Sequence, residues 1–206
     1  MNWKNTSNGY GVMARFFHII MAVMLIGQLA VGTWMVGLPG SEKATIYSNH
    51  KTLGLILLVI VFLRLSWRFI NVLPDLPNTP KWQIFAARSL HRSFYLMMIG
   101  LPISGWMMST AAGFLPVFPG VGKVSFPFFS KNTFCVVGQC FARKEVGSLM
   151  HTTHEVLSWV LATALVVHIS IALWHFHLKD GIFERIFFDR TNNTSSESTK
   201  SKIPST

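Results

Sequence analysis

Four apolar stretches, each long enough to cross a bilayer as a helix, divide this chain of 206 residues. Charged residues stand mainly at the ends of these stretches, and glycines, prolines and polar residues fill the connections. The pattern predicts an all-α integral membrane protein in which residues 1–190 form a bundle of four transmembrane helices. The predicted spans are residues 12–38, 47–70, 88–110 and 149–178.

Two segments lie outside these spans. Residues 111–148 are rich in glycine, proline and phenylalanine, which predicts a long, partly re-entrant loop with aromatic side chains near the membrane interface. Residues 191–206 are rich in serine and threonine, which predicts a disordered cytoplasmic tail. Pro102, inside the third span, predicts a kink that neighbouring helices accommodate.

The composition agrees with a membrane protein. Half of the residues are hydrophobic, 13% are charged, and the mean hydropathy is +0.42. A net charge of +10 could suggest nucleic acid, but no basic helix or RNA-binding motif accompanies it, so we expect no nucleic-acid partner. The connections opposite the termini hold only six of the 18 Lys and Arg, which predicts cytoplasmic termini; these six are Lys43, Lys51, Lys123, Lys131, Arg143 and Lys144.

Histidines inside the spans are the first candidates for function, because ionisable groups within a membrane are costly. The fourth span contains His154 and His168, which are 14 residues apart. On an α-helix this spacing puts them within about 40° of one face and roughly 21 Å apart along the axis. One helix therefore offers two imidazoles at two depths, and each needs a partner from another helix.

The topology predicts which histidines can meet. His18 lies near the cytoplasmic start of the first span, at the depth of His168, and His50 opens the second span from the outside, at the depth of His154. Each of the four is followed four residues later, on the same helix face, by a small residue that would leave room for a flat macrocycle. Those small residues are Ala22, Gly54, Ser158 and Ala172.

Two facing imidazoles at each depth favour two haem irons with two axial histidines each, in an apolar bundle. Zinc fits less well, because a closed zinc site needs four protein ligands in one small volume. Any single histidine could instead be a satisfied packing group or part of a proton relay. Iron with both axial positions filled favours electron transfer over chemistry at the metal.

Several motifs together resemble the prokaryotic cytochrome b561 family, which is related to the four-helix cytochrome b subunits of respiratory hydrogenases and formate dehydrogenases. The resemblance covers about residues 10–190. It is carried by ARFFH at the first histidine, NHKTLGLILLVIVFLRLSWR in the second span, LPDLPNTPKW and AARSLHRSFYLMMIGLPISGWMMSTAAG through the third, and HEVLSWVLATALVVH with WHFHLKDGIFERIF in the fourth.

The resemblance implies two b-type haems in a bacterial inner membrane protein, one held by His18 and His168 and one by His50 and His154. It further implies ubiquinone as an electron partner near the cytoplasmic haem, and superoxide as a substrate that is oxidised at the outer face. The protein would then be an oxidoreductase or an electron carrier. The segment 111–148 is longer than in compact members of the family.

Four other residues are candidates for supporting roles. Lys51 could bind a haem propionate or attract a small anion, and Arg64 could pair with a propionate. His91 could donate a hydrogen bond to a quinone or a propionate, and His175 could handle quinone protons. Each also has a plain interpretation as an interfacial residue. We expect Arg68 to be a cytoplasmic anchor and His151 to be a capping or surface residue.

Two classes of function stay open, a stand-alone oxidoreductase and a membrane-anchor subunit that receives electrons from a docked dehydrogenase. A metal-ion transporter is a third possibility, and it would be colourless. Cys135 and Cys140 lie in the outer loop, where thiols oxidise, so we predict a disulfide between them.

Overall fold

The computed structural model describes residues 2–6, 9–40, 42–74 and 79–178. It confirms the predicted all-α membrane architecture, because its four long helices are apolar enough to cross a membrane. The predicted tail at residues 191–206 lies outside the described residues. The helices are α1 (Val12–Val36), α2 (Glu42–Ile70), α3 (Lys81–Ala111) and α4 (Arg143–Leu178).

Three of the helices begin before the predicted spans. The first helical residues are Glu42, Lys81 and Arg143, where the apolar pattern suggested 47, 88 and 149. The reason is that a helix need not end where its apolar stretch ends, because its polar turns at a membrane surface still bond their own backbone groups. Pro80 forms the N-cap of α3, and the helix continues through Pro102.

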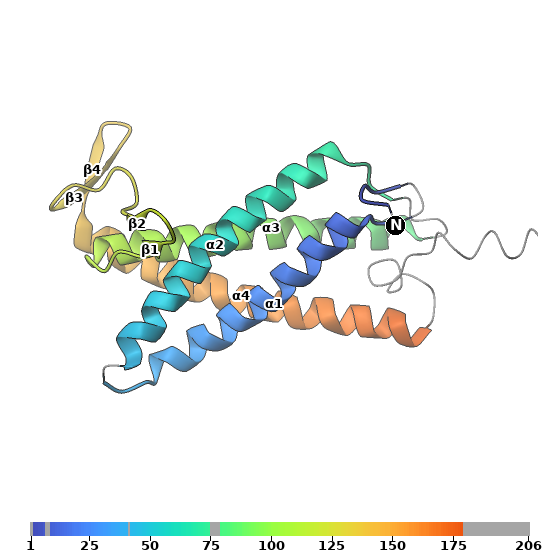
Figure 1. Ribbon diagram of the computed structural model, residues 1–206, viewed down its shortest axis with the longest axis horizontal. Coiled ribbons are helices and arrows are strands. Elements are labelled where there is room, and N and C mark those ends of the chain that lie inside the picture. Colours follow the sequence, from blue (N-terminus) through green and yellow to red (C-terminus); the bar gives the residue numbers. More distant parts are fainter. Residues whose placement is uncertain (1, 7–8, 41, 75–78, 179–206) are drawn as a thin grey trace, which may run out of the picture.

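The four helices form two packed pairs, α1 with α2 and α3 with α4, and α2 also packs on α3. In Figure 1 the α1–α2 pair crosses over the α3–α4 pair at an angle. The connection between α1 and α2 lies at the same end of the molecule as the strands, whereas the N-terminus and the end of α4 lie at the other. Each end of the bundle therefore combines segments far apart in the sequence.

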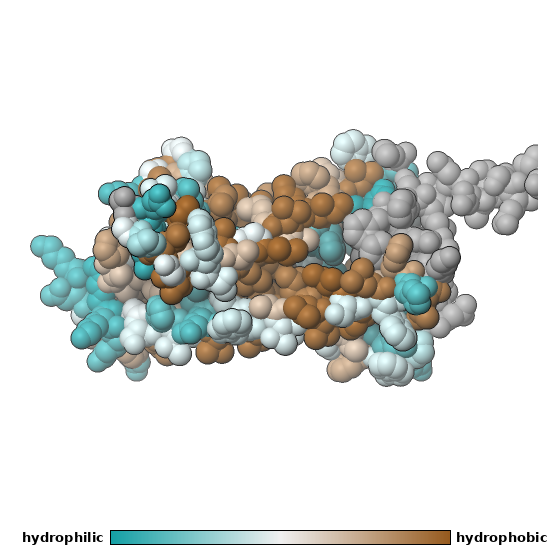
Figure 2. Space-filling view, turned by 90° about the horizontal axis from the view of Figure 1, so that it is seen from below, coloured by the Kyte–Doolittle hydropathy of each residue, from teal (hydrophilic) through white to brown (hydrophobic). Residues whose placement is uncertain are grey.

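A small apolar core holds the pairs together at mid-height. Val61 on α2 and Leu161 on α4 are fully buried at its centre. The outer surface is also apolar, with large exposed side chains such as Leu96 and Trp159. Figure 2 shows hydrophobic residues across the middle of the molecule and hydrophilic residues toward its ends, as lipid surroundings require. The rest of the core is Met21, Leu25, Leu57, Phe94, Met97, Met98 and Leu101.

The segment after α3 differs from the predicted loop, because it contains two antiparallel hairpins. Strands β1 (Val117–Phe118) and β2 (Gly122–Lys123) form the first, and β3 (Thr133–Val136) and β4 (Gln139–Ala142) form the second. Strands this short give no alternating pattern that a sequence could reveal. Residues 143–148, also predicted as loop, are the first turns of α4.

The second hairpin contains the predicted disulfide. Cys135 and Cys140 are directly opposite each other in the β3–β4 register, and their sulfurs are bonded. Val137 and Gly138 form the turn with positive φ angles of 49° and 76°, as a two-residue hairpin turn requires. Val137 is 96% exposed at the tip.

Arg143, the first residue of α4, attaches the segment before the second hairpin to the end of α3. Its Nε donates to the carbonyl oxygen of Ala111 at 2.9 Å, and its Nη2 donates to the carbonyl oxygen of Thr110. Its Nη1 donates to the carbonyl oxygen of Lys131 at 3.2 Å, and the guanidinium lies 5.8 Å from the centre of the Phe129 ring. One side chain thus joins the end of α3, the segment before the second hairpin and the start of α4.

Candidate functional site

Four helical histidines meet as two pairs, one toward each end of the bundle. The rings of His18 on α1 and His168 on α4 have centroids 6.3 Å apart, with an interplanar angle of 31°. The rings of His50 on α2 and His154 on α4 have centroids 6.4 Å apart, with an interplanar angle of 80°. We name them the N-terminal-end pair and the hairpin-end pair.

The spacing within each pair suits one metal atom between two imidazoles. A metal–imidazole nitrogen bond is about 2 Å long, so two such bonds in line put the nitrogens about 4 Å apart and the ring centroids roughly 6 Å apart. Both observed separations agree with this value. Edge-on ring contacts such as Phe126–Phe129 have similar centroid separations, 6.4 Å in that pair, so the spacing alone does not identify a ligand. What favours a shared ligand is that two histidine pairs with this spacing lie at two depths of one bundle.

His154 is held by α3 in an orientation that suits a metal ligand. Its Nδ1 lies 2.9 Å from the carbonyl oxygen of Leu101 and 3.1 Å from the hydroxyl oxygen of Ser104. A carbonyl can only accept, so Nδ1 carries the proton and Nε2 keeps its lone pair. Ligating histidines in proteins characteristically donate their other N–H in this way.

His50 has a different environment. Its Nδ1 is buried and has no hydrogen-bond partner within the described part of the protein. The side-chain amide of Gln28 donates to the backbone carbonyl of His50 at 2.9 Å, which fixes α1 against this turn of α2. A mostly apolar cavity of about 330 Å³ lies beside the ring, between α1 and α2. The cavity therefore leaves open space next to the His50 ring that would suit an apolar macrocycle.

The glycines that approach the rings come from neighbouring helices. A Cβ at Gly105 would lie 3.1 Å from His154 Cε1, and one at Gly32 would lie 3.3 Å from His50 Cε1. Two of the small residues four positions after a histidine have other neighbours. A Cβ at Gly54 would lie 3.5 Å from Nε2 of Gln28, and the hydroxyl of Ser158 donates to the carbonyl of His154 at 2.7 Å. The nearest close approaches are thus between helices, where a spacing rule within one helix could not find them.

The N-terminal-end pair has more aromatic neighbours. The His91 ring lies 5.6 Å from the His168 ring, and the Phe94 ring lies 5.3 Å from it, both edge-on. Nδ1 of His91 is 2.7 Å from the carbonyl oxygen of Ala87, so His91 is fixed on its own helix. α3 thus supplies a third imidazole beside this pair.

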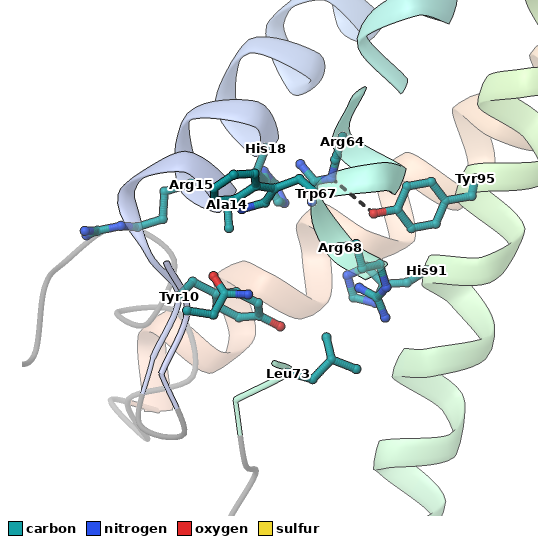
Figure 3. A pocket seen from close by; sticks show the side chains of 11 residues that line it. Tyr10, Ala14, Arg15, His18, Arg64, Trp67, Arg68, Leu73, His91 and Tyr95 are labelled. Atoms are coloured by element: carbon teal, nitrogen blue, oxygen red, sulfur yellow. Dashed lines mark hydrogen bonds between the residues drawn. The ribbon is translucent and has the colours of Figure 1, made fainter. Parts of the chain in front are cut away.

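A small cavity of about 60 Å³ opens next to His18, and Figure 3 shows the side chains around it. Arg64 Nε donates to the hydroxyl of Tyr95 at 3.2 Å, and the Arg68 guanidinium lies 5.8 Å from the Tyr95 ring centre. Trp67 Nε1 is a buried donor with no partner within the described residues. The cavity, which we name the arginine pocket, is lined by Asn5, Tyr10, Ala14, Arg15, His18, Arg64, Trp67, Arg68, Leu73, His91 and Tyr95.

Hydrogen-bond donors dominate the arginine pocket, which suits an anionic group or a carbonyl oxygen. Asn5 and Tyr10, from the segment before α1, line one side of it. Asn5 Nδ2 donates to the carbonyl oxygen of Val72, beyond the end of α2, and Asn5 Oδ1 accepts from the backbone N–H of Gly11 at 3.0 Å. One amide therefore joins the segment that precedes α1 with the segment that follows α2.

The structure brings some of the predicted supporting residues together. Arg64 and His91 both line the arginine pocket. Lys51 instead donates to the carbonyl oxygen of Phe114 at 3.1 Å, so it supports the connection to β1 at the hairpin end of the bundle. His175 lies in the last turn of α4 and His151 is exposed within α4, which begins at Arg143, so His151 is no helix cap.

Sequence reasoning missed several residues of these sites. Arg68 lines the pocket where we expected only an anchor, and Tyr95, Trp67 and Asn5 had no assigned role. Arg64 and Arg68 are one helical turn apart, which is a signal that they share a face. The contact with Tyr95 had no such signal, because it depends on how α2 and α3 are rotated against each other.

Within the described residues, no cluster of three or more His, Cys, Asp or Glu side chains has the arrangement of a metal site. The histidines instead meet as two pairs, an arrangement that suits a haem with two axial imidazoles. The prokaryotic cytochrome b561 family profile matches residues 9–189. The chain belongs to the prokaryotic cytochrome b561 family. It is therefore a haem b membrane cytochrome that takes part in transmembrane electron transfer.

A curated relative also matches most of the chain. The chain is 30% identical over 192 residues to "Cytochrome b561 homolog 2" of Escherichia coli (strain K12), a match that covers 90% of this chain and 95% of the relative. For a cytochrome b561, the histidine pairs and their gaps fit haem, and the arginine pocket suits the carboxylates that a haem carries. The fit rests on the ring separations and on the donors around them.

Proposed function

We propose that this cytochrome b561 holds two haems, one between His18 and His168 and one between His50 and His154, and conducts electrons between the outer face of the membrane and quinone near the cytoplasmic face. The observation that supports this most is the pair of ring separations, 6.3 and 6.4 Å, at two depths of one bundle. The Lys and Arg distribution supports cytoplasmic termini in a bacterial inner membrane, so the hairpins face outward.

Haem b would supply one-electron chemistry when bound, and if His18 with His168 and His50 with His154 held the irons, no iron position would be left for a substrate. The protein's own part is to hold the ligands in the correct tautomer and to bind the partners. His154 donates Nδ1–H to Leu101 and turns Nε2 toward the gap. The apolar core around Val61 and Leu161 separates the two ends and keeps water out.

We propose that quinone is bound and reduced at the arginine pocket. Arg64, Tyr95 and Trp67 offer donors to a quinone carbonyl or to a haem propionate, and the cavity lies directly beside His18. Reduction of ubiquinone to the quinol takes two electrons and two protons. His91, on the pocket wall, and His175, in the last turn of α4, are the residues we assign to handling those protons.

Superoxide is the outer electron donor we propose. Two superoxide anions give one electron each and leave as dioxygen, which supplies the two electrons of one quinol. Lys51 donates to Phe114 near the end of α2 that carries His50, where its ammonium group would attract a small anion. The binding step therefore needs charge but no open coordination position.

The decisive experiment uses the haem-loaded protein in ubiquinone-containing liposomes, with superoxide generated outside. We expect fast haem reduction followed by quinol formation, at two superoxide consumed per quinol. The orientation in each preparation is measured by protease access to the hairpins. If haem-loaded protein with its hairpins outside shows no superoxide-driven reduction at low salt, the superoxide assignment is wrong.

A second candidate function is a membrane-anchor subunit that receives electrons from a docked protein. The observation in its favour is the second hairpin, whose disulfide-closed tip exposes Val137 and Phe141. A variant lacking Phe118 to Gln139 distinguishes the two functions. It would lose reduction by a docked protein, whereas reduction by superoxide would be nearly unchanged. Co-elution of a large partner with the wild-type protein, and its loss from the deletion variant, would support the anchor function.

A further inference from the structure

The segment from Leu101 to Gly105 on α3 brings three features onto one imidazole. Leu101 offers its carbonyl oxygen to His154 Nδ1 at 2.9 Å, and the Ser104 hydroxyl lies 3.1 Å from the same nitrogen. Gly105 leaves the space that the ring occupies. The segment reads LPISG, a motif that the haem-ligand assignment alone leaves unexplained.

Ser104 is placed to share the proton of His154. Its hydroxyl donates to the carbonyl oxygen of Leu101 at 2.9 Å, so its lone pairs are available to accept from Nδ1–H. The side chain is only 2% exposed, so water does not compete for these bonds. The imidazole proton therefore has two acceptors in a dry site, which increases the electron density on Nε2.

Gly105 is required because the ring lies directly against its backbone. A Cβ there would lie 3.1 Å from Cε1 and 3.2 Å from Nδ1 of His154, which is closer than side chains normally approach. The ring cannot move away without loosening its bond to Leu101. A methyl group at this position would therefore turn or displace the imidazole.

The partner histidine shows that this arrangement is specific to one side. His50 Nδ1 is buried without a hydrogen-bond partner among the described residues, although Gly32 approaches its ring in a similar way. Of the two hairpin-end imidazoles, His154 thus donates its Nδ1–H to α3, whereas Nδ1 of His50 has no such acceptor within the described residues. The electron density that the ligands give to the iron depends on such hydrogen bonds.

We propose that Leu101, Ser104 and Gly105 form a cradle that positions His154 and lowers the reduction potential of the hairpin-end haem. The inference rests on the proposed ligand role of His154. Gly105 fixes the position of the ring, and Ser104 with the Leu101 carbonyl sets its tautomer and basicity. These are positioning residues, because none of them touches the iron.

The first test compares two glycine variants on the same helix. Gly105→Ala places a methyl against the rigid imidazole, whereas in Gly100→Ala the new methyl meets only the flexible end of Leu157, at 3.3 Å. We expect Gly105→Ala to shift or abolish the low-spin electron paramagnetic resonance signal of the hairpin-end haem, with the N-terminal-end signal retained as proof of folding. Gly100→Ala should match the wild type. Equal, wild-type spectra for both variants would overturn the role of Gly105.

The second test measures potentials in a spectroscopic redox titration. Ser104→Ala removes one acceptor, so we expect the hairpin-end midpoint potential to become more positive at unchanged haem content, whereas Ser104→Thr, which keeps a hydroxyl, should restore it. An unchanged potential in Ser104→Ala, or equal shifts at both haems, would overturn the role of Ser104. His154→Ala serves as the reference: if it keeps both haems, the ligand assignment fails, and if it loses one while the cradle variants behave as wild type, only the cradle fails.

Discussion

Each end of the bundle contains a pair of facing histidines, but the residues around the two pairs differ. At the N-terminal end, His18 and His168 lie beside a third imidazole and a pocket that contains Arg64 and Arg68. At the hairpin end, His154 is bonded to a backbone carbonyl and a serine. Positive charge stabilises the reduced haem, whereas a more basic imidazole stabilises the oxidised one. The comparison predicts that electrons move from the hairpin end to the N-terminal end.

Ligand removal is the strongest way to test whether the two ends are independent. We expect His18→Ala and His154→Ala each to lower the haem content from about two to about one per chain, with each variant losing a different signal. The core around Val61 and Leu161 lies between the sites, so one site should survive loss of the other. Haem content by the pyridine haemochrome assay and paramagnetic resonance spectra measure this. Loss of both haems in either variant would show that the ends form one cooperative unit.

The next largest effect should come from the arginine pocket. Arg64→Gln removes a half-buried positive charge beside His18, so the N-terminal-end midpoint potential should become more negative. Loss of a charged hydrogen bond to the quinone should slow its reduction by about ten- to a hundredfold. Arg88→Gln is the matched control, because Arg88 is exposed at the same end of α3 and does not line the pocket. Equal effects of both substitutions would show that the loss of one positive charge anywhere at this end of the bundle, and not a contact in the pocket, causes the change.

A charge substitution at Lys51 tests the hairpin end, and we expect a smaller effect than at Arg64. Lys51→Glu reverses a charge near His50, so superoxide-driven haem reduction should slow by about tenfold at low salt, and by less as salt rises. Haem content should stay unchanged. Lys131→Glu gives the same net charge change at an exposed position just before the second hairpin. Stopped-flow absorbance measures both, and a rate independent of salt and of Lys51 would argue against steering.

The sequence predicts the depth of the histidines at both ends, but not the contacts around them. The four spans and the pairing of histidines by depth follow from the sequence, because periodicity and hydropathy fix depth. The Arg64–Tyr95 bond and the Gly105–His154 contact could not be predicted, since both depend on the rotation of one helix against another. The hairpins were missed because strands of two to four residues carry no periodic signal.

The smallest expected effect concerns the hairpin tip. Replacing Cys135 and Cys140 by serine should lower the free energy of opening this hairpin by about 2 kcal/mol in the loop-entropy model. Amide hydrogen exchange across β3 and β4 measures the change. Because Arg143 attaches the segment before the hairpin to the end of α3 independently of the disulfide, both haem spectra should match those of the wild type. Altered spectra would mean that the tip supports the hairpin-end site.

The most direct test of the central claim is an anomalous difference map at the iron edge, from crystals of the haem-loaded protein. Two iron peaks are expected, one between the rings of His18 and His168 and the other between those of His50 and His154, each about 2 Å from both ligating nitrogens. A single peak, or a peak beside His91 in place of His18, would contradict the account.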